Sequence, residues 1–299
     1  MTEPQPMLPW VGTPAPSYPP GIFPGLFPDH GALLISGGKE VGKSLIALEI
    51  SQSAVTGQPL WGALTPTYTV QKVVYIFAEH GGHGSLSQLW QAVGLEDPGQ
   101  SIRVCDTLRP LVNRGQVMTA ARDFYCQRVE GAGLVIFDPL SAFMSGEDTE
   151  NQALPTRTLI NTMEYIANST KANLLILGHF GKLHYREDLG EAVHSGTRGS
   201  SALEHAATAV FYLSKGRRGD TYQVFNLASE YFKGDALPPL RLIRPDDELQ
   251  HHLDISKGHP QRSRTRRIAG RKGGKRSAEV RWGPQPVVVE DDKTPQGFA

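Results

Sequence analysis

The chain alternates short apolar segments with longer segments whose apolar residues recur at helical spacing. Four apolar runs occupy residues 32–35, 73–77, 134–137 and 174–177. Each run is apolar at consecutive positions, which is typical of strands covered on both faces of a sheet. Helical segments such as 44–55 and 156–169 lie between the runs. Strands that alternate with helices predict an α/β fold, with a central, mostly parallel sheet flanked by helices.

Further apolar segments at 209–214, 222–228 and 240–243 predict an antiparallel extension of this sheet. Residues 1–28 contain nine prolines and predict an extended, non-helical arm, because proline fixes φ and lacks an N–H donor. Apolar periodicity fades after residue 245. The sequence therefore divides into a proline-rich arm (1–28), an α/β domain (29–245) and a C-terminal tail (246–299).

The charge is distributed unevenly, although the net charge is zero. Residues 257–281 contain ten lysines and arginines but a single acid, Glu279. The rest of the chain therefore holds 20 basic residues (30 − 10) against 29 acidic ones (30 − 1). We expect the tail to be disordered without a partner, apart from a helix near 275–281, and contacts with polyanions to be concentrated there.

Composition argues against membrane and secreted proteins. No apolar run approaches the ~20 residues that span a bilayer, and no signal-peptide pattern is present at the start. The two cysteines, Cys105 and Cys126, form neither a CxxC pair nor a Cys/His cluster, so we expect free thiols in a reducing compartment. The sequence therefore predicts a cytoplasmic protein.

The strongest motif is the octapeptide GGKEVGKS at residues 37–44, which fits GxxxxGK[ST]. It lies between a predicted strand and a predicted helix, as a phosphate-binding loop requires. Its glycines let successive N–H groups point at the β-phosphate, and the helix N-terminus adds partial positive charge. Lys43 is expected to bridge the β- and γ-phosphates of ATP, and the Ser44 hydroxyl to bind Mg²⁺. The expected nucleotide-binding residues are Gly37, Gly38, Lys39, Glu40, Val41, Gly42, Lys43, Ser44 and Leu45.

Three polar residues follow predicted strands, at the edge where parallel sheets bind ligands. Asp138 closes the run 134–137 and is expected to hold Mg²⁺ through its water shell; the alternative is a helix N-cap. Glu79 follows the run 73–77 and is expected to act as general base, with a surface acid as the alternative. His179 follows the run 174–177, where it either contacts the γ-phosphate or is merely a satisfied polar residue.

The residues 37–44, 75–80, 134–138 and 178–182 together resemble the RecA/DnaB/KaiC-like ATPases. The chain resembles most the RepA-like hexameric helicases of plasmids and phages, whose segment before the phosphate loop is similar to residues 22–26 and whose RGSSAL motif is similar to residues 198–203. The resemblance covers about 21–243 and implies a RecA-like ATPase core that assembles as a ring, expected to be hexameric.

The resemblance also implies that a basic residue of a neighbouring subunit completes each active site. Lys233 is the expected residue and Arg217 and Arg218 are alternatives, although each is equally consistent with a solvated charge in a hairpin.

The resemblance further implies contacts with single-stranded DNA. Arg198, Gly199 and Ser200 follow a predicted loop (184–197), and the corresponding region of such proteins faces the central channel. A helix-capping role for Ser200 is the alternative. The tail offers a second set of phosphate contacts, namely Arg264, Arg266, Arg267, Arg271 and Lys272. The alternative for the tail is a solvated extension.

These observations predict an ATP- and Mg²⁺-dependent motor that translocates on, or unwinds, DNA. Two other functions fit the same core: a RadA-like recombination mediator that forms filaments on DNA, and a KaiC-like regulatory NTPase with protein partners. Strand pairing without unwinding favours the first of these two, and indifference to DNA favours the second.

Overall fold

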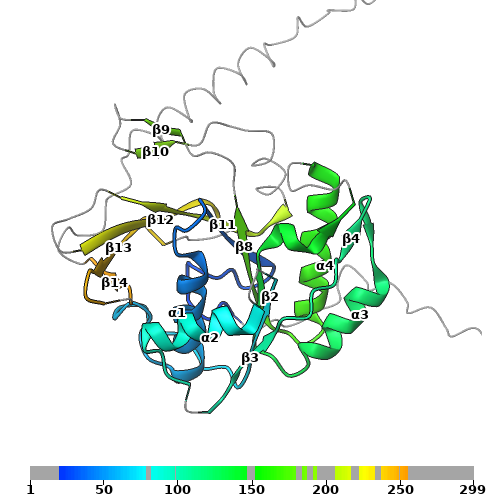
Figure 1. The fold of residues 1–299 in the computed structure, drawn as a ribbon, viewed down its shortest axis with the longest axis horizontal. Coiled ribbons are helices and arrows are strands. Elements are labelled where there is room, and N and C mark those ends of the chain that lie inside the picture. The colour runs from blue at the N-terminus through cyan, green and yellow to red at the C-terminus, as the bar shows by residue number, and fades with distance from the viewer. Residues whose placement is uncertain are drawn as a thin grey trace, which may run out of the picture. The chain divides into compact units, whose positions relative to one another are not determined.

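A nine-stranded sheet is the centre of the described structure (Figure 1), with the strand order β14-β13-β12-β11-β1-β8-β6-β2-β3. The computed structural model describes residues 20–78, 82–97, 99–146, 152–179, 184–186, 191–193, 206–216, 222–232, 237–248 and 250–254.

Six neighbouring strands of this sheet are parallel. They are β11 (Ala209–Lys215), β1 (Ala32–Gly37), β8 (Asn173–His179), β6 (Leu134–Asp138), β2 (Val73–Phe77) and β3 (Ile102–Cys105). The predicted parallel α/β sheet is thereby confirmed. Four of the strands coincide with the apolar runs that predicted them, whereas β3 was not predicted. The prediction for 209–214 was wrong in direction: these residues were expected in an antiparallel extension, but β11 is parallel to β1, and the antiparallel part begins with the next strand.

The remaining strands of the sheet are antiparallel, as predicted for residues 222–228 and 240–243 but not for residues 252–253. They are β12 (Tyr222–Phe232), β13 (Leu240–Pro245) and β14 (His252–Leu253). Because Leu242 of β13 pairs with Leu253 of β14, the sheet continues past residue 245, where the sequence placed the end of the domain.

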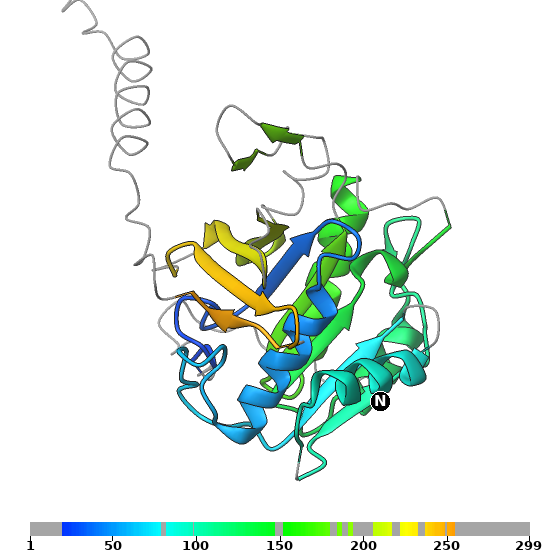
Figure 2. The same cartoon turned by 60° about the vertical axis from the view of Figure 1, so that its left-hand side comes forward.

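Helices cover both faces of the sheet, and Figure 2 shows α1 (blue) and α4 (green) on opposite sides of it. The helices are α1 (Lys43–Thr56), α2 (Gly82–Val93), α3 (Thr119–Arg128), the 3₁₀ helix η1 (Leu140–Phe143) and α4 (Ala153–Asn168). Residues of α1 and α2 pack into one apolar core, and residues of α3, η1 and α4 pack into another.

Consecutive residues of β1 illustrate why its sequence is continuously apolar. Leu33 and Ile35 belong to the core under α1, whereas Ala32 and Leu34 belong to the core under α4. Successive side chains of a strand point to opposite faces, so a strand with helices on both sides needs an apolar residue at every position.

Residues 20–28 do not form the extended arm that their prolines predicted. The core under α1 buries four apolar residues of this segment, namely Ile22, Phe23, Leu26 and Phe27. The chain makes a turn here, in which the N–H of Phe27 donates to the carbonyl of Phe23 at 2.9 Å. Apolar burial outweighs the extended preference of the prolines here. The rest of the predicted arm, residues 1–19, lies outside the described residues.

Two smaller sheets complete the described structure. One contains β4 (Val112–Asn113), β5 (Gln116–Val117) and β7 (Met144–Ser145). The other pairs β9 (His184–Arg186) with β10 (Glu191–Val193) in antiparallel fashion, in a stretch that the sequence predicted to be a loop. Among the described helices, none is long and apolar enough to cross a membrane.

Candidate nucleotide-binding site

The phosphate loop connects β1, which lies between two parallel neighbours, to α1. Gly37 ends β1 and pairs with Leu213 on one side and His179 on the other. A Cβ added to Gly37 would come within 2.5 Å of the Leu213 carbonyl oxygen, so only glycine fits between the strands here.

Gly42 occupies the N-cap position of α1 in a left-handed conformation, with φ 94° and ψ 21°. Other residues rarely adopt this conformation, which explains the second glycine of the motif. Gly42 has no side chain with which to cap the helix, and the first N–H groups of a helix have no acceptor within the helix. Uncapped N–H groups at a helix N-terminus bind anions, including phosphate.

Lys43 folds back over the loop and is only 5% exposed. Its ammonium group donates to the carbonyl oxygens of Gly37 (3.1 Å) and Gly38 (2.8 Å) and lies 3.1 Å from Nδ1 of His179. Since an ammonium group has no acceptor, Nδ1 of His179 must accept this hydrogen bond, and any ring proton is on Nε2. The structure thus brings two of the predicted site residues into contact.

Asp138 closes β6 and is 1% exposed. Its Oδ2 accepts hydrogen bonds from the Ser44 hydroxyl (2.7 Å) and from the Tyr75 hydroxyl (2.8 Å). The following helix, η1, has Pro139 at its N-cap position and no side-chain cap, so Asp138 does not serve as the alternative N-cap.

The donors around Asp138 fit a nucleotide-bound magnesium ion. Mg²⁺ prefers hard oxygen ligands and usually combines one or two carboxylates with waters and substrate phosphates. The Ser44 hydroxyl and the Asp138 carboxylate are two such oxygens, held together by a hydrogen bond. Within the described residues, no group of three or more His, Cys, Asp or Glu side chains forms a complete metal site. Phosphate oxygens and water would therefore have to supply the other ligands.

A family model described as an AAA domain matches residues 8–184, more than half of the chain. The chain belongs to this AAA domain family of P-loop ATPases. The matched range contains the phosphate loop, Asp138 and His179, so the AAA domain assignment and the site agree in position. No curated protein matches the chain.

Four predicted site residues of the AAA domain lie together: Lys43, Ser44, Asp138 and His179. By contrast, the side chains of Lys39 and Glu40 point outward, with 86% and 81% exposure and 3.9 Å between their charged groups. These two residues can reach a nucleotide in this arrangement only through their backbone N–H groups.

The remaining predicted catalytic and DNA-binding residues lie outside the described residues. They are Glu79, Lys233 and its alternatives Arg217 and Arg218, the DNA-binding residues Arg198, Gly199 and Ser200, and the tail residues Arg264, Arg266, Arg267, Arg271 and Lys272. Ala78, which precedes Glu79, donates its N–H to the Asp138 carbonyl at 2.8 Å. The chain therefore leaves β2 beside Asp138.

The sequence analysis did not identify Tyr75 as a hydrogen-bond partner of Asp138, although the strand sequence indicates that Tyr75 needs such a partner. Tyr75 is fully buried within an otherwise apolar run, and a buried hydroxyl nearly always needs a hydrogen-bond partner. An acid at the end of the neighbouring strand is a suitable partner, because Tyr75 pairs with Ile136, two residues before Asp138.

Proposed function

We propose that this AAA domain is a DNA-dependent motor, in which a ring of identical subunits, expected to be hexameric, hydrolyses ATP to translocate on or unwind single-stranded DNA. The contact between Lys43 and His179 carries this proposal. His179 is the last residue of β8, and the expected DNA contacts begin 19 residues later in the sequence, at Arg198. The resemblance to RepA-like helicases supports the same assignment.

In the proposed reaction, the phosphates of ATP replace the carbonyl oxygens of Gly37 and Gly38 as partners of Lys43. Ser44 and Asp138 would hold Mg²⁺, which when bound would neutralise phosphate charge. Glu79 takes a proton from the attacking water, the new bond forms between that oxygen and the γ-phosphorus, and the bond to the β-phosphate oxygen breaks to release ADP. Lys233 of a neighbouring subunit stabilises the added negative charge of the transition state.

The DNA contacts in this proposal are distributed over two segments. Arg198, Gly199 and Ser200 contact phosphates inside the ring, and the basic tail adds sequence-independent contacts. The body of the chain is acidic, so the tail is expected to contribute most of the salt-dependent affinity. The proposed location is the cytoplasm.

The deciding experiment measures ATP hydrolysis with and without single-stranded DNA at low salt, with Lys43→Ala as the blank. Stimulation of at least about tenfold that disappears in Lys43→Ala supports a DNA motor. A forked DNA substrate then tests unwinding, and sedimentation in the presence of ATP tests ring assembly.

Each contrary result points to a particular alternative. Pairing of complementary strands without unwinding indicates a RadA-like recombination mediator. ATP turnover that ignores DNA indicates a KaiC-like regulatory NTPase and contradicts the motor proposal.

A further inference from the structure

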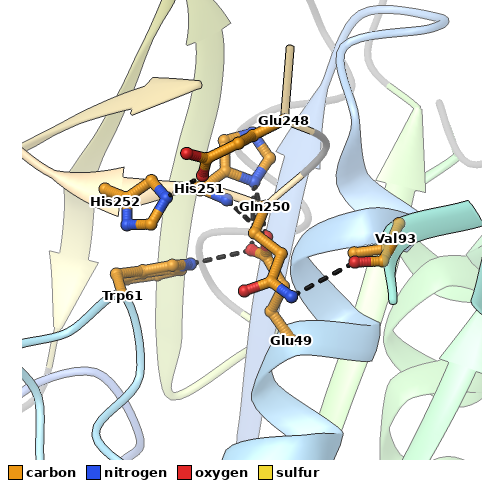
Figure 3. A network of polar contacts seen from close by, with 7 residues as sticks. All are labelled: Glu49, Trp61, Val93, Glu248, Gln250, His251 and His252. Atoms are coloured by element: carbon orange, nitrogen blue, oxygen red, sulfur yellow. Dashed lines mark hydrogen bonds and ion pairs between the residues drawn. The ribbon is translucent and has the colours of Figure 1, made fainter. Parts of the chain in front are cut away.

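A buried polar network joins α1 to the last described residues of the chain (Figure 3). Glu49, on α1, accepts hydrogen bonds from the indole N–H of Trp61 (2.9 Å) and from the backbone N–H of His251 (2.7 Å). Nδ1 of His251 lies 3.0 Å from the same carboxylate. Three N–H donors around one buried carboxylate compensate for its loss of water, so Glu49 fixes the position of the His251 ring.

The imidazole ring of His251 lies beside the phosphate loop. The side chain is 0% exposed and packs edge-on against Phe225, with 4.6 Å between the ring centroids. A Cβ placed on Gly42 would lie 4.0 Å from Cε1 of His251, at van der Waals distance. The adjacent ring atom, Nε2, has no hydrogen-bond partner within the described part of the chain.

The segment 250–254, which carries His251, is attached to several elements. The Gln250 side chain donates to the Val93 carbonyl at the end of α2 (3.1 Å), and the Leu253 N–H donates to the Trp61 carbonyl (3.1 Å). Arg241 of β13 forms an ion pair with Asp254 (3.2 Å). Glu49 therefore holds Nδ1 of the His251 ring, and the contacts of the segment 250–254 hold the backbone that carries this ring.

We infer that His251 is a positioning residue for the phosphate loop and that it couples the segment 250–254 to nucleotide binding. This inference rests on the proposed binding of ATP at residues 37–45. Gly42, whose left-handed conformation directs the first N–H groups of α1, has the His251 ring as the nearest group on the side where a Cβ would stand. Removing the imidazole widens the space on this side of the loop and takes one donor away from Glu49 of α1, so the loop loses support for its phosphate-binding geometry.

The coupling acts in both directions. If the position of the segment 250–254 alters phosphate affinity, nucleotide binding must stabilise that segment by the same free energy. The chain continues from this segment into residues 255–299, which contain the basic tail. Binding of a partner to the tail would thereby reach the phosphate loop through His251 and Glu49.

The first test measures binding of a non-hydrolysable ATP analogue to the full chain by calorimetry. His251→Ala is expected to weaken binding about tenfold, the lower end of the effect of removing a residue that orients a binding group. His252→Ala is the matched control, because His252 is the next residue and its side chain is 45% exposed and forms its hydrogen bond with the exposed Glu248. Met163→Ala, in the core on the opposite face of the sheet, controls for lost stability.

A third variant distinguishes two roles of the His251 ring: its support of the phosphate loop and its hydrogen bond to the Glu49 carboxylate. In His251→Asn, the amide group is expected to donate to Glu49 still, but the ring atoms on the side of Gly42 are missing, so binding should be as weak as in His251→Ala. Wild-type affinity in either His251 variant, or an equal loss in Met163→Ala at matched stability, overturns the inference. Absence of binding by the wild-type chain overturns the proposed function and the inference together.

The second test measures amide hydrogen exchange of His251 and Leu253 with and without the analogue. Coupling predicts that exchange of both amides slows at least about threefold in the wild type and stays unchanged in Lys43→Ala. Exchange rates that do not respond to the nucleotide in a wild-type chain that binds it contradict the coupling alone.

Discussion

The Tyr75 hydroxyl donates a hydrogen bond to Oδ2 of Asp138 over 2.8 Å, so the acid of the proposed Mg²⁺ site is held from within the core. Ser44 donates to the same oxygen at 2.7 Å. In the proposed reaction Ser44 would help to hold Mg²⁺, whereas the hydrogen bond from Tyr75 to Asp138 would remain. We therefore expect Tyr75 to keep the Asp138 carboxylate oriented when the metal is bound.

Replacement of Tyr75 by phenylalanine tests this role without altering the shape of the core. Outer-sphere partners of metal ligands typically contribute tenfold or more to metal affinity, so Tyr75→Phe should raise the Mg²⁺ concentration for half-maximal ATP hydrolysis about tenfold. The measurement is a Mg²⁺ titration at saturating ATP. Tyr68→Phe, which removes a hydroxyl from a tyrosine whose hydrogen bonds run to Pro20 and Asn173, is the control. Equal Mg²⁺ dependence in the wild type and Tyr75→Phe would contradict this role of Tyr75.

The two lysines of the phosphate loop should differ sharply in importance. Lys43 is buried against Gly37, Gly38 and His179, whereas the Lys39 side chain is exposed. Lys43→Ala should weaken ATP binding at least about a hundredfold, because a buried cation that neutralises phosphate charge is removed. Lys39→Ala keeps its backbone N–H and should change binding less than about twofold. Titration of both variants with a fluorescent ATP analogue measures the difference, and comparable losses would contradict the observed orientation of the loop.

The first two glycines of the loop provide a matched pair for stability. A methyl group on Gly37 would meet the Leu213 carbonyl at 2.5 Å, whereas a methyl group on Gly38 would meet open space. Gly37→Ala should therefore lower the free energy of unfolding by about 1–3 kcal/mol, as overpacking does, because the contacted atom belongs to the backbone of β11. Gly38→Ala should leave it nearly unchanged. Urea denaturation of both variants measures the free energies, and an effect of Gly38→Ala as large as that of Gly37→Ala would refute the steric explanation.

Glu164 gives the fold a pH dependence of known sign. Burial raises the pKa of this carboxyl above its ordinary value of 4.5, and a hydrogen bond from the Ala32 N–H (3.0 Å) opposes the shift without cancelling it. The folded-state pKa of Glu164 is higher than its unfolded-state pKa, so the protonated carboxyl contributes to the stability of the folded state. This contribution is fully present below pH 4.5 and is lost as the pH rises through the folded-state pKa. Glu164→Gln keeps an acceptor for Ala32 but never ionises. Its Tm should therefore rise relative to the wild type as the pH increases from 4.5 to 7, and a difference that stays constant over this range would argue against the shift.

The sheet was predictable to the extent that its strands are apolar at every position. The runs at 73–77 and 174–177 predicted strands because burial on both faces leaves no polar position. β3, Ile102–Cys105, escaped prediction because it lies at the edge of the sheet, where its residues are at most half-buried and Arg103 is exposed. The prolines of 20–28 predicted an extended arm for a related reason. The backbone preference of proline does not indicate whether neighbouring apolar residues, such as Ile22 and Phe23, are buried in a core.

The site was predictable where a motif is contiguous or follows a strand directly. The loop 37–44 is contiguous, and Asp138 and His179 each follow an apolar run. Tyr75 and His251 contribute through contacts across the sheet or between distant segments, and no spacing rule connects Glu49 with a residue 202 positions later. Such pairs become visible only when the fold brings the segments together.

The placement of β1 has a thermodynamic consequence for ligand binding. Because β1 pairs with a parallel strand on each side and all its residues are buried, its amides are expected to exchange with solvent only when the whole domain unfolds. Partial openings at the sheet edges therefore leave the phosphate loop intact. A nucleotide bound there opposes global unfolding itself, so the midpoint of thermal denaturation should rise with the logarithm of ATP concentration once the site is saturated.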